Sequence, residues 1–79
     1  MTESKYLEFY LLERKPRTTV WQVKSKHSGD ILGVIKWFGK WRQYAFFPWL
    51  DTIWNPDCMT DIIQFIRELM DKRKKEPRP

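Results

Sequence analysis

The sequence predicts an α+β fold, in which a three- or four-stranded antiparallel β-meander packs on a single C-terminal α-helix. Strand-like segments separated by turn residues fill residues 6–47, and one apolar stripe at helical spacing follows Asn55. A chain of 79 residues can bury only a thin core, which favours one sheet with one layer against it. We therefore expect a single domain over residues 1–75 and a frayed C-terminal tail at residues 76–79.

The four predicted strands cover residues 6–13, 18–25, 31–37 and 42–47. In the first strand, Leu7, Phe9 and Leu11 fall on one face at a period of two. Pro16 interrupts the chain before the second strand, and Gly29 stands in a turn where a positive φ is available to glycine. Because the connections are short, successive strands are expected to pair antiparallel.

The predicted helix begins next to Asn55, which is a good N-cap residue. Pro56 suits the first helical position, and the carboxylate of Asp57 favours the positive end of the helix dipole. The expected apolar stripe consists of Met59, Ile62, Ile63, Ile66, Leu69 and Met70. The cations of residues 72–75 follow at the C-terminal end, where the helix dipole favours them.

One helix can cover only one side of the sheet, so the alternation along each strand predicts which side is buried. The side expected under the helix carries Trp21, Val23, Gly33, Ile35, Trp37, Tyr44 and Phe46. The exposed side is expected to carry Val20, Gln22, Lys24, Val34, Lys36, Gln43, Ala45 and Phe47. Gly33 leaves room for a neighbouring ring or for the helix. A bulge near Gly33 or Gly39 would invert part of this assignment.

Aromatic residues and positive charge are concentrated in adjacent parts of the chain. Eight rings lie between Trp37 and Trp54, and residues 14–42 carry eight Lys or Arg against the single Asp30. Rings in a small sheet are more often core than ligand contacts, yet so many cannot all be central. Rings that stack on bases and cations that meet phosphates are the pairing used by single-strand binding proteins. The sequence therefore predicts a binding module that contacts nucleic acid.

The residues expected to carry that binding lie on the exposed sheet face and in the hairpin beside it. Lys24, Lys36, Lys40 and Arg42 would contact phosphates, and Trp41 or Phe47 would stack on bases.

The sequence contains few residues that would indicate an enzyme. The only histidine, His27, lies beside Ser28 and Asp30 in a predicted turn, and neighbours in sequence do not make a catalytic triad. Cys58 lies in the first turn of the helix, where the dipole could activate the thiol, although packing is the favoured interpretation. One His and one Cys cannot supply a tetrahedral zinc site. We expect a protein that is not an enzyme and needs no cofactor or metal.

Residues 28–48, SGDILGVIKWFGKWRQYAFFP, resemble a pattern of small uncharacterised proteins from phages and bacterial genomes. That pattern reads approximately SGxxLGxIKWxxxWRQYxFFP, and the likeness extends loosely over residues 18–70. The resemblance brings no established activity with it. It implies a context in which small phage proteins often act by binding and modulating host machinery.

The predicted architecture is also similar to the DNA-binding domains of plant ethylene-response factors and of some integrase N-termini. Those domains insert a sheet face into the major groove. This likeness implies the same contact candidates as above, namely Lys24, Lys36, Lys40 and Arg42. The sheets of those domains are denser in arginine, the commonest reader of guanine.

A second hypothesis belongs to a different class: a protein-interaction module, such as a phage inhibitor of a host or defence protein. Trp41, Trp49 and Trp54 would anchor such an interface, because binding hot spots favour Trp, Tyr and Arg. Association with a second copy of the chain is one version of it. No apolar run reaches the length of a membrane span, and one cysteine without a signal peptide fits the cytoplasm.

Overall fold

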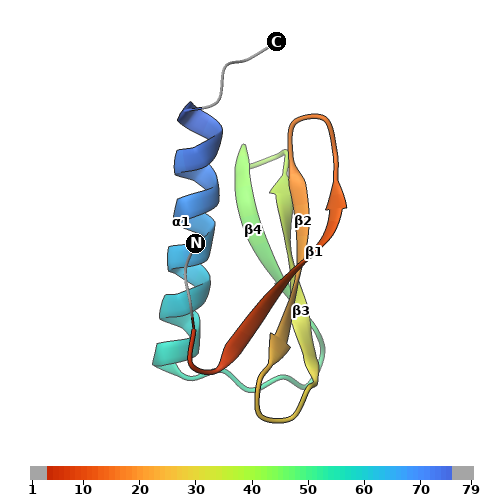
Figure 1. The fold of residues 1–79 in the computed structure, drawn as a ribbon, viewed down its shortest axis with the longest axis vertical. Helices are drawn as coiled ribbons and strands as arrows, with labels where there is room; N and C mark the ends of the chain where they lie inside the picture. Colours follow the sequence, from red (N-terminus) through yellow and green to blue (C-terminus); the bar gives the residue numbers. More distant parts are fainter. Residues whose placement is uncertain (1–3, 76–79) are drawn as a thin grey trace.

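The computed structural model describes residues 4–75, apart from the side chain of Lys75, and the expected fraying of residues 76–79 lies outside this range. It contains four strands and one helix: β1 (Leu7–Arg14), β2 (Thr19–Ser25), β3 (Ile31–Phe38), β4 (Gln43–Pro48) and α1 (Pro56–Lys75). The strands form one antiparallel sheet in the order β1-β2-β3-β4. Figure 1 shows α1 lying along one side of this sheet. The predicted α+β meander is confirmed, with four strands.

The sheet face predicted to be buried does lie under α1. In the register of the strands, Val23 pairs with Gly33, Ile35 with Phe46, and Trp37 with Tyr44, so these residues share one face. The buried hydrophobic core consists of Leu7, Val23, Ile35, Tyr44, Ile62, Phe65 and Leu69. The alternation of apolar residues along the strands was therefore sufficient to orient the sheet.

The expected apolar stripe of α1 was partly wrong. Phe65 was not assigned to it, yet this side chain is 1% exposed and its ring stacks on Phe9 at 4.1 Å between centroids. The ring of Trp21 meets the edge of the same phenyl group at 5.1 Å. Met59 and Ile63 were assigned to the stripe but are 47% and 49% exposed. The helix is rotated so that its largest ring fills the space over β1 and β2.

A bulge lies beside Gly33, one of the two positions where a bulge was expected to invert part of the face assignment. The β2–β3 register shifts after the pair of Val23 and Gly33, so that Lys24 pairs with Ile31. The bulge does not exchange the two faces of the sheet, because Lys24 remains over Tyr10, on the side away from α1. The ring of Phe46 occupies the room that Gly33 leaves open.

The start of α1 is fixed by its N-cap and by the N-terminal segment. The Asn55 side-chain oxygen accepts a hydrogen bond from the backbone N–H of Cys58 at 2.8 Å, which confirms the predicted cap. The buried Ser4 hydroxyl donates to the Asp61 carboxylate at 2.5 Å and accepts from the backbone N–H of Leu7 at 3.0 Å. The carbonyl of Ser4 also accepts a hydrogen bond from Lys26 Nζ. Ser4 thus joins the entrance of β1 to α1.

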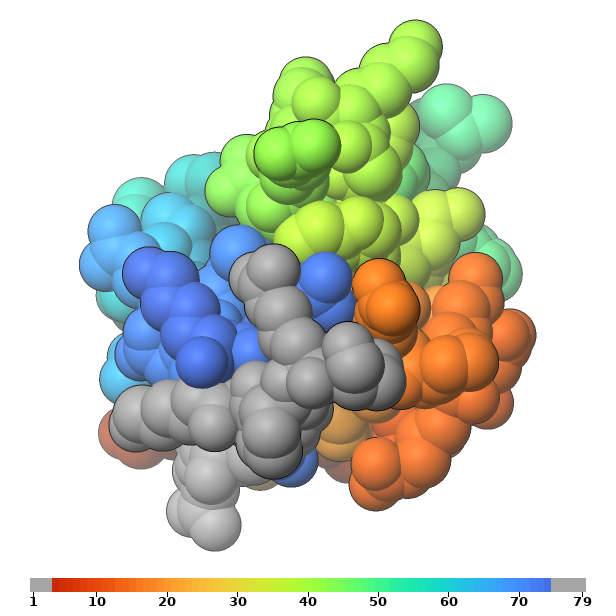
Figure 2. All heavy atoms as spheres, turned by 90° about the horizontal axis from the view of Figure 1, so that it is seen from above, coloured from red at the N-terminus to blue at the C-terminus, as the bar shows by residue number. Residues whose placement is uncertain are grey.

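The meander gathers three parts of the chain at one end of the molecule. Because the strands alternate in direction, the β1–β2 turn and the β3–β4 turn lie at the same end, and α1 runs back toward it. Figure 2 looks onto this end and shows the β1–β2 turn (orange), the β3–β4 turn (green) and the end of α1 (blue) around it. Residues 14–17 and 72–74 therefore lie at the same end although more than fifty positions separate them in sequence.

Candidate nucleic-acid interface

The side of the sheet turned away from α1, which we call the open face, combines lysines with aromatic rings. Lys36 Nζ lies over the ring of Phe47 at 4.7 Å, and Lys24 Nζ lies over the ring of Tyr10 at 5.6 Å from the centroid. Both distances are within the range of a cation–π interaction. Lys24, Lys36 and Phe47 come from β2, β3 and β4, so three neighbouring strands contribute to one surface.

Three rings form a cluster at one end of the open face: Phe38, Trp41 and Phe47. The edge-to-face contacts place Phe38 4.8 Å from Trp41 and 6.0 Å from Phe47. Trp41 is 64% exposed, so most of its indole is accessible to a ligand. A partly exposed indole supported by a second ring can stack on a base without losing its own packing.

Lys40 and Arg42, the other two predicted contact residues, lie in the turn between β3 and β4. Lys40 is exposed there. The backbone of Arg42 has a left-handed φ of 53°, and its side chain lines a hollow of about 460 Å³ on the helix side of the sheet. The other residues that line this hollow are Trp37, Gly39, Met70, Arg73 and Lys74. The structure therefore does not bring Arg42 together with Lys24 and Lys36.

Positive charge on the open face is stronger toward β3 than toward β1. Glu8 lies opposite Lys24 in the β1–β2 register, and its carboxylate accepts a hydrogen bond from the Tyr10 hydroxyl. That hydrogen bond to Glu8 raises the pKa of Tyr10, so the phenol stays protonated at neutral pH. Lys36 lies opposite Ala45 and is exposed, which makes it the lysine best placed to meet a phosphate.

Neither residue weighed for catalysis stands in a reactive setting. Burial raises the pKa of the Cys58 thiol, and the nearby Asp61 carboxylate raises it further, so the thiol is protonated at neutral pH. The packing interpretation of Cys58 agrees with its contact with the core. His27 is exposed in the β2–β3 turn, with its ring 6.2 Å from that of Tyr6. Among residues 4–75, no group of three or more His, Cys, Asp or Glu side chains could hold a metal ion.

The sequence interpretation missed a second hollow, of about 290 Å³, between the β1–β2 turn and the last turns of α1. Its lining residues are Arg14, Lys15, Pro16, Arg17, Thr18, Thr19, Trp21, Tyr44, Leu69, Lys72 and Arg73. The interruption of the chain at Pro16 and the cations of residues 72–75 were recognised only separately. The alternating direction of the strands was the available signal that these two segments lie at the same end of the molecule.

Comparison with known proteins gives a relative of unknown activity. The chain is 32% identical over 72 residues to the "Uncharacterized 9.3 kDa protein" of Acholeplasma phage L2, a match that covers 90% of this chain and 92% of that protein. The chain belongs to the family of this phage protein. No protein-family model matches it, and no solved structure does.

The expected resemblance to small uncharacterised phage proteins is thus confirmed for this phage family. The relative's name states no ligand, so the function has to be argued from the site. No helix in the described part of the chain has the length and apolar character needed to cross a membrane.

Proposed function

We propose that this member of the phage family is a non-enzymatic binding module that contacts single-stranded nucleic acid through the open face. The observation that carries the proposal is the proximity of Lys36 to the ring cluster of Phe38, Trp41 and Phe47. The ammonium group and the exposed indole offer a phosphate contact and a stacking surface within one patch. Proteins that bind single strands without sequence preference combine these two features.

Each residue of the patch has a separate role in this proposal. Lys36 and Lys24 neutralise phosphates of the bound strand, and Trp41 stacks on a base. Phe38 supports the indole of Trp41, and Phe47 holds the ammonium of Lys36 over its ring. Base stacking is tolerant of sequence because every base has a π-face. Binding with little base preference is therefore expected.

A titration with short single-stranded DNA and RNA tests the proposal, with tryptophan emission as the readout. Replacing Lys24 and Lys36 together by Gln should weaken binding about thirtyfold or more, since each charged hydrogen bond contributes about 1 kcal/mol or more. Gln is preferable to a carboxylate side chain at these positions, because a carboxylate in place of Lys24 would face Glu8 across the β1–β2 pair and repel it. Trp41→Ala should cost about 1–3 kcal/mol of binding free energy through lost stacking.

The matched control is Lys5→Gln with Arg67→Gln, which removes the same charge from exposed positions off the open face. An equal loss of affinity in this control would show that only net charge matters. Unchanged affinity in the folded Lys24→Gln, Lys36→Gln variant would refute the open face as the site.

One observation favours the second hypothesis, a protein-interaction module. Leu50 and Ile53, in the connection between β4 and α1, are each 93% exposed, and Trp49 beside them is 51% exposed. Exposed apolar residues of this size are typical of surfaces that bind another protein. Trp54, named as an anchor of such an interface, instead packs its ring on Phe46 at 4.8 Å and contacts the core. An interface there would rest on Trp49, Leu50 and Ile53.

A further inference from the structure

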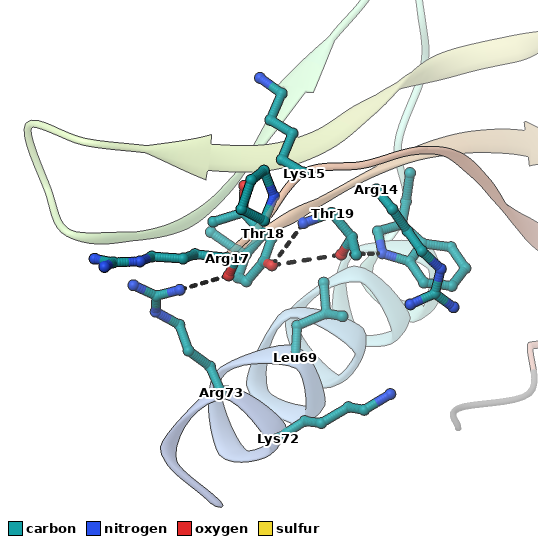
Figure 3. A pocket seen from close by; sticks show the side chains of 11 residues that line it. Arg14, Lys15, Arg17, Thr18, Thr19, Leu69, Lys72 and Arg73 are labelled. Atoms are coloured by element: carbon teal, nitrogen blue, oxygen red, sulfur yellow. Dashed lines mark hydrogen bonds between the residues drawn. The ribbon is translucent and has the colours of Figure 1, made fainter. Parts of the chain in front are cut away.

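The hollow between the β1–β2 turn and the end of α1 is lined by cations from two distant parts of the chain. Arg14 comes from the end of β1, Lys15 and Arg17 come from the β1–β2 turn, and Lys72 and Arg73 come from the helix. Figure 3 shows Arg17 and Arg73 side by side and Lys15 pointing away from the helix. The described residues that line the hollow include no carboxylate. The positive charge of the hollow is therefore not neutralised by any of these lining residues.

The helix dipole accounts for only part of this charge. The C-terminus of a helix carries about half an elementary negative charge, which exposed cations in the last turn offset. Lys72, Arg73 and Lys74 already exceed that amount. Arg14 ends β1 and Arg17 lies in the β1–β2 turn, where no helix end explains them. Bringing them against the helix cations costs repulsion that a bound anion would relieve.

The walls of the hollow are held by hydrogen bonds. Arg73 donates from Nη1 to the Arg17 carbonyl at 2.7 Å, and its guanidinium stacks over Trp37 at 4.3 Å. The Tyr44 hydroxyl accepts a hydrogen bond from the Thr19 backbone N–H at 3.0 Å. Trp21 Nε1 donates to Thr19 Oγ1 at 2.8 Å, and Figure 3 marks the hydrogen bonds at Thr19 as dashed lines. Arg73 and the residues around Thr19 are thus held in place by these contacts.

We propose that this hollow binds phosphoryl groups of a polyanion, with Arg14, Arg17 and Lys72 as the contacting cations. A guanidinium group can donate two parallel hydrogen bonds to two oxygens of one phosphate, and the ammonium of a lysine adds a point charge. The hollow lies on the helix side of the sheet, so it is a different site from the open face. Its ligand is either a free polyphosphate or the phosphodiester backbone of a nucleic acid, and these share the same oxygens.

The five tryptophans of the chain provide a residue-resolved test by ¹H–¹⁵N NMR of their indole groups. Trp21 lines the hollow, whereas Trp41 lies in the ring cluster of the open face. Titration with inorganic tripolyphosphate should shift the Trp21 indole signal saturably and leave Trp41 unchanged. Arg14→Gln combined with Lys72→Gln should weaken this binding about tenfold or more. If a decanucleotide also shifts the Trp21 signal, the ligand is the phosphodiester backbone of a nucleic acid. If it leaves Trp21 unchanged, the ligand is free polyphosphate.

The control is again Lys5→Gln with Arg67→Gln, which removes one lysine and one arginine elsewhere and should bind tripolyphosphate as the unaltered chain does. Absence of a saturable Trp21 shift, or an equal weakening in this control, would overturn the hollow as a phosphate site. The proposed function fails separately, through an unresponsive Trp41 in the oligonucleotide titration. Indole signals that keep their dispersion in every variant show that the fold is retained.

Discussion

At the scale of single residues, Gly33 is a position with no room for a side chain. A Cβ atom there would lie 2.5 Å from the Phe47 carbonyl oxygen and 2.8 Å from the ring of Phe46. The carbonyl belongs to the backbone of β4, so it cannot move without disturbing the β3–β4 ladder. Gly33→Ala should therefore lower the free energy of unfolding by about 1–3 kcal/mol.

Urea unfolding curves measure this effect, and Gly39 supplies the matched control. A Cβ at Gly39 would meet no atom within 4 Å, so Gly39→Ala should stay within about 0.5 kcal/mol of the unaltered chain. Equal stability of the two alanine variants would contradict the close approach of β4 to Gly33.

At the scale of elements, the attachment of α1 to the entrance of β1 depends on one hydroxyl. Ser4 Oγ bonds Asp61 and also accepts the backbone N–H groups of Tyr6 and Leu7. Ser4→Ala would leave these groups without their partner, at a cost of about 1–3 kcal/mol in unfolding free energy. Ser28→Ala is the control, because that hydroxyl accepts one long hydrogen bond in an exposed turn. Thermal unfolding of both variants should show a loss confined to Ser4→Ala.

The elements also show what the sequence could and could not predict. The strands and the Asn55 cap were predicted because alternation and capping are local properties. Phe65 was missed because its burial depends on how α1 is rotated over Phe9 and Trp21, which only the assembled sheet decides. Trp54 was interpreted as an anchor for the same reason, since its contact with Phe46 joins a connection to a strand.

In the candidate sites too, local patterns were predicted from the sequence and contacts made by packing were not. The open face was largely predicted, because alternation places Lys24, Lys36 and Phe47 on one side of the sheet. Arg42 was placed there by its position in sequence, but its backbone conformation turns it to the helix side. The hollow between the β1–β2 turn and the end of α1 could have been predicted from the alternating strand directions, although its shape depends on the packed helix.

At the scale of the whole molecule, salt distinguishes the two functional hypotheses. Neutralising phosphates releases counterions, so the logarithm of the affinity for a single strand falls by about 0.7 per contacting cation for each tenfold rise in salt. Loss of Lys24 and Lys36 should therefore reduce this slope by about 1.4. Fluorescence titrations at four salt concentrations measure it. A slope near zero in the unaltered chain would favour the protein-interaction hypothesis, because apolar contacts respond weakly to salt.

The alternating direction of the strands also separates charge along the molecule, whose longest extent is 40 Å. The cations of the hollow between the β1–β2 turn and the end of α1 lie at one end. Among the described residues, the other end carries Asp30, Asp51 and Asp57 together with only Lys5 and Lys26. A body charged in this way experiences a torque in the field of a polyanion and turns its basic end forward before contact. For the polyanion ligand proposed above, the topology of the sheet would therefore set the orientation of the approach as well as the shape of the fold.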